Sequence, residues 1–293
     1  MIVAIQPDNY GQGDTSCTIW KRVLERAGHE VRLVNVYSPD ILEQLQGCDG
    51  FMWRHGHYPQ MRLVAQRLLP IIERELNLDV YPDQNTCWHY DDKLAQAFLL
   101  PAVGVPTPRT WVWFDQQEAL EWAGSAKYPL VMKLWAGAGS SNVCLVKSFS
   151  EAILWINRLF GVGVTSVQKA KMPLREKLRR AYDVILGRQE ALPWLTHKGY
   201  ALFQEFLEGN PYVTRVTVIG ERAFGFRRFN RPNDFRASGS GKIDYTPDEI
   251  APEFIRLAFD TARRLRSQSC AIDGLWRGSQ PVVGEVTYTY TSW

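Results

Sequence analysis

Cysteine is scarce in this chain, and its spacing matches neither a metal site nor a disulfide framework. The 293 residues include five cysteines, and no two of them form a CxxC pair. They stand far apart, at Cys17, Cys48, Cys87, Cys144 and Cys270. An odd number of widely separated cysteines argues against both a zinc site and a set of disulfides. The sequence therefore predicts a protein of the reducing cytoplasm.

Long apolar runs and a strong charge bias are also lacking. No segment approaches the roughly 18 apolar residues of a membrane-spanning helix. Residues 1–7 are mainly apolar but have no basic lead-in, so we expect a first strand rather than a signal peptide. The net charge is +3, and 45% hydrophobic with 22% charged residues is an ordinary globular mixture. These values predict a soluble protein with no membrane span and no nucleic-acid partner.

The best-known nucleotide-binding and nucleophile motifs do not occur either. The chain has neither the GxxxxGK[ST] spacing of a P-loop nor the GxGxxG spacing of a dinucleotide-binding turn. No Ser/His/Asp or Cys/His arrangement is evident among its five histidines and five cysteines. A reaction that depends on a side-chain nucleophile is therefore not indicated.

What the chain does contain is a β-α-β beginning. An apolar strand in 1–7 is followed by an amphipathic pattern over 16–28 that ends on Gly28, and by a second strand pattern over 29–36. Residues 1 to about 80 are expected to form a small parallel α/β layer. The proline-containing segment 104–108 should break a helix and lead into a strand, which places a boundary near residue 105.

A segment rich in Lys and Arg lies between about 161 and 198. One interpretation is a solvated insertion helix. The other is a basic lid or docking surface for an acidic substrate. The sequence does not separate the two.

Two carboxylates near the C-terminus sit on a predicted hairpin. Asp273 and Glu285 lie on two short strands joined by a turn at 277–280. A solvated hairpin would have the same pattern. Side by side, however, the two carboxylates would form an oxygen-rich site for Mg²⁺, which prefers oxygen ligands and is often held by one or two carboxylates plus substrate phosphates.

Lysine and glycine occur where a phosphate could be held. Lys133 ends an apolar strand directly before the glycine-rich stretch 136–142, whose small residues let backbone N–H groups approach a ligand. A plain hairpin turn is the alternative. Lys93 follows Asp91 and Asp92, which are predicted to cap a helix. Gln204 and Glu205 end another apolar strand, where backbone could meet an adenine edge.

Arginine is dense on two adjacent predicted strands and the loop that follows them. A planar guanidinium matches carboxylates and phosphates, so this density favours an anion site over a salt-bridged sheet surface. The residues are Arg215, Arg227, Arg228, Arg231 and Arg236.

The order of these weak motifs along essentially the whole chain resembles the ATP-grasp superfamily, and most closely its branch of ribosomal-protein glutamate ligases. The resemblance implies a mixed α/β and α+β fold, in which an N-terminal parallel α/β (pre-ATP-grasp) domain precedes a two-subdomain ATP-grasp fold. We expect the first domain over 1–105. The small subdomain, with its basic insertion near 161–198, would span 106–203, and the C-terminal subdomain with the metal site would span 204–293.

The resemblance also implies residue roles, with ATP and Mg²⁺ as cofactors and Mn²⁺ as an alternative metal. Catalytic roles fall on Arg215, Lys133 and Arg236, and metal binding falls on Asp273, Glu285 and Thr287. The nucleotide would be held by Lys93, Lys133, Gly137, Gly139, Ser140, Ser141, Gln204, Glu205, Phe206, Leu207, Glu208 and Arg215. The acid or amine substrate would meet Arg54, His55, His57, Arg227, Arg228, Arg231, Arg236 and Ser238.

Two positions depart from the family pattern. An acidic residue usually stands two positions before the arginine at 215, but this chain has Val213, so the ribose contact would come from elsewhere, with Glu208 as the candidate. Thr287 stands where an asparagine metal ligand is expected. Thr287 and Ser238 can still offer neutral oxygens.

The implied function is an ATP-dependent carboxylate–amine ligase that forms an amide through an acyl phosphate and releases ADP and phosphate. Its partners would be a carboxylate on a small molecule, an acidic peptide or an acidic sugar, and an amine. The alternatives are a non-catalytic ATP-binding sensor or scaffold, which the two departures favour, and a phosphotransferase on the same fold. The oligomeric state stays open, with a homodimer as one option.

Overall fold

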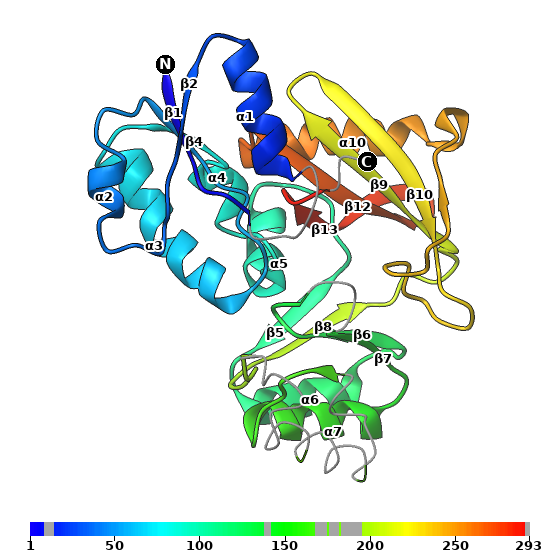
Figure 1. Cartoon of the computed structure of the whole chain (residues 1–293). Coiled ribbons are helices and arrows are strands. Elements are labelled where there is room, and N and C mark those ends of the chain that lie inside the picture. Colours follow the sequence, from blue (N-terminus) through cyan, green and yellow to red (C-terminus); the bar gives the residue numbers. More distant parts are fainter. Residues whose placement is uncertain (9–14, 138–141, 168–174, 176–181, 183–194, 291–293) are drawn as a thin grey trace.

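The described part of the chain forms three β-sheets (Figure 1). The computed structural model describes residues 1–8, 15–137, 142–167, 175, 182 and 195–290. One sheet is entirely parallel and two are antiparallel. The predicted mixture of an N-terminal parallel α/β layer with later α+β units is therefore confirmed.

The N-terminal sheet has the strand order β2-β1-β3-β4 and is parallel throughout. Its strands are β1 (Ile2–Ile5), β2 (Glu30–Leu33), β3 (Gly50–Met52) and β4 (Asp79–Tyr81). Its helices are α1 (Ser16–Arg26), α2 (Ile41–Gln44) and α3 (Pro59–Arg74). Helix α1 starts at Thr15, whose hydroxyl accepts from Thr18 N, and Gly28 follows it with φ 82°, as the glycine stop signal predicts.

The next sheet has the order β5-β8-β6-β7. Its strands are β5 (Thr110–Trp113), β6 (Leu130–Lys133), β7 (Val143–Val146) and β8 (Ala201–Glu205). Helices α6 (Gln116–Ser125) and α7 (Phe149–Phe160) both lie on one side of it (Figure 1). Trp155, Ile156 and Leu159 of α7 are buried against Phe203 of β8, so this sheet has a core of its own.

The third sheet has five antiparallel strands in the order β11-β10-β9-β12-β13. They are β9 (Tyr212–Ile219), β10 (Arg222–Phe229), β11 (Ile243–Asp244), β12 (Ser269–Arg277) and β13 (Gln280–Thr287). A short 3-10 turn, η1 (Pro247–Glu249), leads to α10 (Pro252–Leu265). Helix α10 packs on the sheet through Phe254, Leu257 and Ala258.

Helix α5 and the residue after β13 are among the connections between the N-terminal layer and the five-stranded sheet. After β4 come the short α4 (Gln84–Cys87) and α5 (Lys93–Ala102), and α5 packs against the five-stranded sheet through Leu100. Beyond β13, Tyr288 is buried in the N-terminal core beside Trp53, and its hydroxyl donates to the His55 carbonyl oxygen. Helix α5 is thus packed against the five-stranded sheet, and the chain beyond β13 is anchored in the N-terminal core.

The predicted domain limits stay predictions, although the boundary near 105 falls in the loop between α5 and β5. Most of the basic segment between 161 and 198 lies outside the described residues, and so do Gly139, Ser140 and Ser141 of the predicted glycine-rich loop. Within the part of the chain that the structure describes, no helix is both long and apolar enough to cross a lipid bilayer.

Packing of β12 on α10 generates a stability prediction. A Cβ added to Gly274 would overlap the ring of the fully buried Phe254. Gly274→Ala should therefore lower the free energy of unfolding by roughly 1–3 kcal/mol, the usual cost of an overpacked core, as measured by urea denaturation. Gly124→Ala is the matched control, because Gly124 lies in α6 with its nearest neighbour 3.9 Å away. Equal stability of the two variants would contradict the prediction.

Candidate active site

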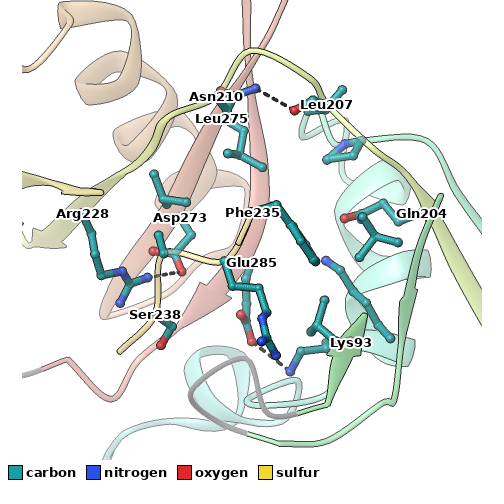
Figure 2. Close-up of a pocket in the computed structure, with 18 of the residues that line it drawn as sticks. Lys93, Gln204, Leu207, Asn210, Arg228, Phe235, Ser238, Asp273, Leu275 and Glu285 are labelled. Atoms are coloured by element: carbon teal, nitrogen blue, oxygen red, sulfur yellow. Dashed lines mark hydrogen bonds and ion pairs between the residues drawn. The ribbon is translucent and has the colours of Figure 1, made fainter. Parts of the chain in front are cut away.

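A cavity of about 330 Å³ lies where the β5-β8-β6-β7 sheet meets the five-stranded sheet (Figure 2). Lys93 and Glu285 lie at one end of the view, and Leu207 and Asn210 lie at the other (Figure 2). The charged residues that line the cavity are Asp91, Lys93, Lys133, Glu205, Arg215, Arg228, Arg236, Asp273 and Glu285. Residues almost two hundred positions apart are therefore brought together here.

The predicted carboxylate pair stands side by side on β12 and β13, where Asp273 pairs with Glu285 across the ladder. Asp273 accepts from Arg215 Nε at 2.7 Å and Nη2 at 2.8 Å, and from Arg228 Nη2 at 3.1 Å. Burial alone would raise the pKa of Asp273, but the two guanidiniums more than offset this and hold the pKa below its ordinary value. Asp273 is thus an ionised carboxylate.

Lys93 lies at the first turn of α5, where Asp92 caps the helix by accepting from Ala95 N at 2.8 Å. Its Nζ is 3.2 Å from Glu285 Oε1, 3.3 Å from Asp91 Oδ1 and 3.2 Å from the Gly137 carbonyl oxygen. Burial would lower the pKa of Lys93, but Glu285 and Asp91 raise it above its ordinary value. Lys93 therefore stays protonated.

Gln96, one turn further along α5, fixes the position of Lys93 relative to β13. Its Nε2 donates to the Val286 carbonyl oxygen at 2.7 Å, and its Oε1 accepts from Val286 N at 3.0 Å. The Gln96 side-chain amide thereby makes the same pair of hydrogen bonds with Val286 that a neighbouring strand would make. Because Val286 stands between Glu285 and Thr287, Gln96 sets the register of both against α5.

Lys133 ends β6 and also lines the cavity. Burial lowers its pKa to about 8; Lys93 adds to this, whereas Glu285 and Asp273 act in the opposite direction. Among the described residues, no carboxylate lies within ion-pair distance of its Nζ. A half-buried cation of this kind is suited to an anionic ligand.

The start of the glycine-rich loop is held by Asp91. Gly137 N lies 3.0 Å from Asp91 Oδ1 and 3.1 Å from Oδ2, and the φ of Gly137 is 130°. A Cβ at this position would overlap the Asn142 side chain. Glycine is therefore required where the loop leaves β6.

The strand end that was predicted to meet a base forms the wall opposite the carboxylate pair. Gln204, Glu205, Phe206 and Leu207 all line the cavity, whereas Glu208 is exposed and lies outside the lining. The Glu205 side chain accepts from Arg109 N and from Arg277 Nε, each at 2.8 Å. The Glu205 carboxylate therefore holds the segment before β5 and the end of β12 in place, and these two hydrogen bonds occupy its Oε1 atom.

The sequence matches no protein-family model, and no curated protein matches it. Solved structures match over almost the whole chain. An ATP-grasp RimK domain protein from Sphaerobacter thermophilus superposes with a TM-score of 0.61 at 18% identity, covering 98% of this chain and 90% of that one. This chain has the ATP-grasp fold.

Two further ATP-grasp structures match at similar coverage. D-alanine–D-alanine ligase from Bacillus anthracis, complexed with ATP, gives a TM-score of 0.54 at 13% identity over 98% of this chain and 86% of that one. The ATP-grasp ligase PsnB, complexed with a minimal precursor, gives 0.59 at 15% identity over 99% and 91%. The resemblance predicted from the motifs is thereby confirmed at the level of the fold.

Within this ATP-grasp fold, the arginines predicted from sequence divide into two groups. Arg215, Arg228 and Arg236 line the cavity, as does Ser238. Arg227 instead pairs with Asp244 and Glu249, and Arg231 donates through Nε to the Ser238 carbonyl oxygen at 2.7 Å. Arg227 therefore stabilises the sheet and the turn before α10, and Arg231 stabilises the loop 231–238. Neither residue is part of the cavity lining.

The predicted substrate residues after β3 also lie away from this cavity. His55 is buried between Trp53, Tyr90 and Tyr288, His57 stacks on Tyr58, and Arg54 Nη2 donates to the Tyr290 carbonyl oxygen at 3.4 Å. None of the three is among the lining residues. Their predicted substrate role stays a prediction.

The residues that would hold a metal offer oxygen atoms only. Asp273, Glu285 and Thr287 all line the cavity, and Thr287 Oγ1 lies 3.2 Å from Thr289 Oγ1. No group of three or more His, Cys, Asp or Glu side chains converges in the described ranges. Two carboxylates and a hydroxyl fit Mg²⁺ that is completed by substrate phosphates, but not an all-protein metal cage.

Sequence reasoning missed two residues of this site. Gln96 carried no signal, because its partner is the backbone of a strand 190 residues away. The sequence predicts both Asp91 and Asp92 as helix-capping acids, but the structure gives that role to Asp92 alone. Asp91 is buried with φ 50° and contacts Arg62, Lys93 and Gly137.

The Gln96 contact gives a testable prediction. Gln96→Leu would leave the buried N–H and carbonyl of Val286 without their partner, and each such group costs about 1–3 kcal/mol. The free energy of unfolding should therefore fall by roughly 2 kcal/mol or more in urea denaturation. Gln117→Leu, on the exposed face of α6, is the matched control and should change stability by less than about 0.5 kcal/mol.

The lowered pKa of Lys133 gives a second prediction. In the unfolded chain the pKa is near its ordinary value of 10.5, and in the folded chain it is about 8, so the unfolded chain binds more protons between these values. The contribution of Lys133 to stability therefore rises with pH across this window. Lys133→Met should be more stable than wild type at pH 7, and the difference should shrink between pH 8 and 10. The exposed Lys127→Met is the control, and a constant difference for Lys133→Met would contradict the assignment.

Proposed function

We propose that the chain is an ATP-dependent carboxylate–amine ligase of the cytoplasm. One observation carries the proposal: Lys93, Lys133 and Arg215 share a single cavity with the carboxylates Asp273 and Glu285. The cations that would hold phosphate and the carboxylates that would hold magnesium line the same cavity, which supports the proposal. The matching ATP-grasp structures include a D-alanine–D-alanine ligase with ATP and a ligase with a precursor, which agrees with this kind of reaction.

ATP would lie along the cavity, with adenine at 204–207 and its phosphates toward the lysines. The side chains of Gln204, Phe206 and Leu207 carry no charge, which suits contact with a base. Charged side chains, among them Lys93 and Glu285, line the other end of the cavity. Lys93 and Lys133 would neutralise phosphate oxygens. Arg215 uses Nε and Nη2 for Asp273, and its Nη1 can donate to the transferred phosphate.

The amide would form in two steps. A carboxylate oxygen of the substrate attacks the γ-phosphorus, the bond to the bridging oxygen breaks, and ADP leaves. The amine nitrogen then attacks the acyl carbon, phosphate leaves with the electrons of the carbon–oxygen bond, and the nitrogen loses a proton. Phosphoryl transfer needs positioning and charge neutralisation rather than a covalent helper, which agrees with the lack of a nucleophile motif.

The metal and the substrate would be held by the same face of the sheet. Asp273, Glu285 and Thr287 would bind Mg²⁺, which when bound supplies positive charge to the phosphates. Mn²⁺ would fit the same oxygen ligands. Arg228 and Arg236 would attract the carboxylate substrate, and Arg236 is itself oriented by Asp234. The chemistry of these groups suits a small molecule, an acidic peptide or an acidic sugar.

A non-catalytic ATP sensor is the second candidate, and a specific observation favours it. Val213 and Thr287, the two departures from the family pattern, both line the cavity. Valine cannot bind a ribose hydroxyl, and threonine is a weaker metal ligand than a carboxamide or carboxylate. A sensor would bind ATP without turnover, and a phosphotransferase would release ADP without needing an amine.

The proposal predicts magnesium-dependent binding of a non-hydrolysable ATP analogue in isothermal titration. Lys133→Met should weaken binding at least tenfold, because it removes a phosphate-facing cation, and Lys127→Met should bind as wild type does. Acid–amine pairs would then be screened for phosphate release that requires both partners. If wild type does not bind the ATP analogue, the nucleotide site is contradicted. If it binds the analogue but no acid–amine pair causes phosphate release, the result favours the non-catalytic ATP sensor.

A further inference from the structure

Three hydroxyl groups form a hydrogen-bonded chain beside the carboxylate pair. They belong to Thr287, Thr289 and Tyr90, and all three residues line the cavity of about 330 Å³. Thr287 Oγ1 lies 3.2 Å from Thr289 Oγ1, and Thr289 Oγ1 donates to the Tyr90 hydroxyl oxygen at 2.9 Å. The proposed reaction gives Thr289 and Tyr90 no role.

The register of β13 places Thr287 next to the carboxylates. Thr287 ends this strand and pairs with Ala271, two positions from the pair that Asp273 makes with Glu285. Successive side chains of a strand point to opposite faces, so Thr287 shares a face with Glu285. Thr287 and Thr289 are each half-buried, and both therefore keep part of their surface accessible.

The hydrogen bonds determine where each hydroxyl proton points. A threonine hydroxyl has one proton and two lone pairs. Thr289 donates its only proton to Tyr90, so Thr287 must be the donor in the contact between the two threonines. Thr287 Oγ1 also accepts from Thr289 N at 3.2 Å. Among the described residues, no donor contacts the second lone pair of Thr287, and that lone pair is available to a cation.

A hydroxyl differs from an amide oxygen as a metal ligand. It binds a cation through a lone pair, and its proton must point away from the cation and find an acceptor. The carbonyl oxygen of an asparagine carries no proton and needs no such acceptor. A bound divalent cation also makes the O–H group a stronger donor, as it does for a bound water molecule. The group that accepts the proton of Thr287 therefore affects how firmly Thr287 can hold a metal.

We propose that Thr289 and Tyr90 are positioning residues for Mg²⁺, acting through Thr287. Thr289 accepts the proton of Thr287, Tyr90 accepts the proton of Thr289, and the remaining lone pair of Thr287 is thereby directed to the metal. Tyr90 is a fixed end for this chain, because it is buried and its ring packs edge-on against Tyr288 with centroids 4.8 Å apart. This inference rests on the proposed nucleotide and magnesium site.

Isothermal titration of the full-length protein with a non-hydrolysable ATP analogue, in EDTA and in excess Mg²⁺, tests the role of Thr289. The ratio of the two affinities measures how much the metal strengthens nucleotide binding. Thr289→Val keeps the shape of the side chain but removes the hydroxyl, so this ratio should fall about tenfold. The affinity in EDTA should stay within about twofold of wild type, because the nucleotide contacts are unchanged. An unchanged ratio would overturn the proposal.

Two further threonine variants serve as controls for this titration. Thr289→Ser keeps the hydroxyl and should keep the wild-type ratio. Thr261→Val makes the same chemical change at a buried position of α10 outside the cavity lining, and should also leave the ratio unchanged. A loss in Thr289→Ser as large as in Thr289→Val would contradict the role of the hydroxyl.

Thr287→Asn separates a positioning role from a structural one. This variant presents an oxygen without a proton to direct, so adding Thr289→Val to it should change the ratio by less than about twofold. A structural role of Thr289 would cause the same loss in both backgrounds, and that result would refute the proposal.

Tyr90→Phe gives the answer where Thr289→Val fails to fold. It removes the acceptor for the proton of Thr289, which can then turn to Thr287 and occupy the lone pair meant for the metal. The ratio should again fall, by about threefold or more. If wild type binds the analogue and neither variant changes the ratio, this inference alone is refuted. If wild type binds the analogue in neither condition, the proposed nucleotide site is refuted as well.

Discussion

The contact between Lys93 and Glu285 holds the candidate active site together. It joins the first turn of α5 to β13, at an Nζ to Oε1 distance of 3.2 Å, and Asp91 and the Gly137 carbonyl share the same ammonium. The buried ammonium of Lys93 therefore contacts three parts of the structure: Asp91 directly before α5, Gly137 at the start of the glycine-rich loop, and Glu285 in the five-stranded sheet. Removing either Lys93 or Glu285 should lower the stability of the fold, because the remaining charge would lose its partner.

The balance of charge in the cavity follows from that contact. Asp273 is neutralised by two guanidiniums and Glu285 by Lys93, so the carboxylate pair is already matched within the protein. Lys133 is the group whose pKa burial depresses, which means that its positive charge is poorly compensated. An incoming triphosphate would supply negative charge at that point. The same triphosphate would compete for Lys93 and Arg215, and so release carboxylate oxygens toward a metal.

Sequence reasoning recovered the features that depend on local pattern. Apolar strands, a glycine stop after α1 and a hairpin carrying Asp273 and Glu285 all follow from neighbouring residues. It could not recover Gln96, since a glutamine in a helix gives no sign that it will pair with a distant strand. His55 shows the converse: two histidines near an arginine suggest a site, yet packing buries one of them in an aromatic cluster.

The apolar part of the cavity lining explains why the departure at Val213 matters. The cavity lining also includes Val213, Leu275 and Phe235, and Phe235 makes an edge contact with Phe206 at 5.7 Å. This wall can pack against a sugar but offers it no carboxylate. Recognition of a nucleotide here would then depend on the base and the phosphates. An ATP-grasp fold with such a wall should be selective for the triphosphate and less so for the ribose hydroxyls, because an apolar wall gives little penalty for a missing hydroxyl.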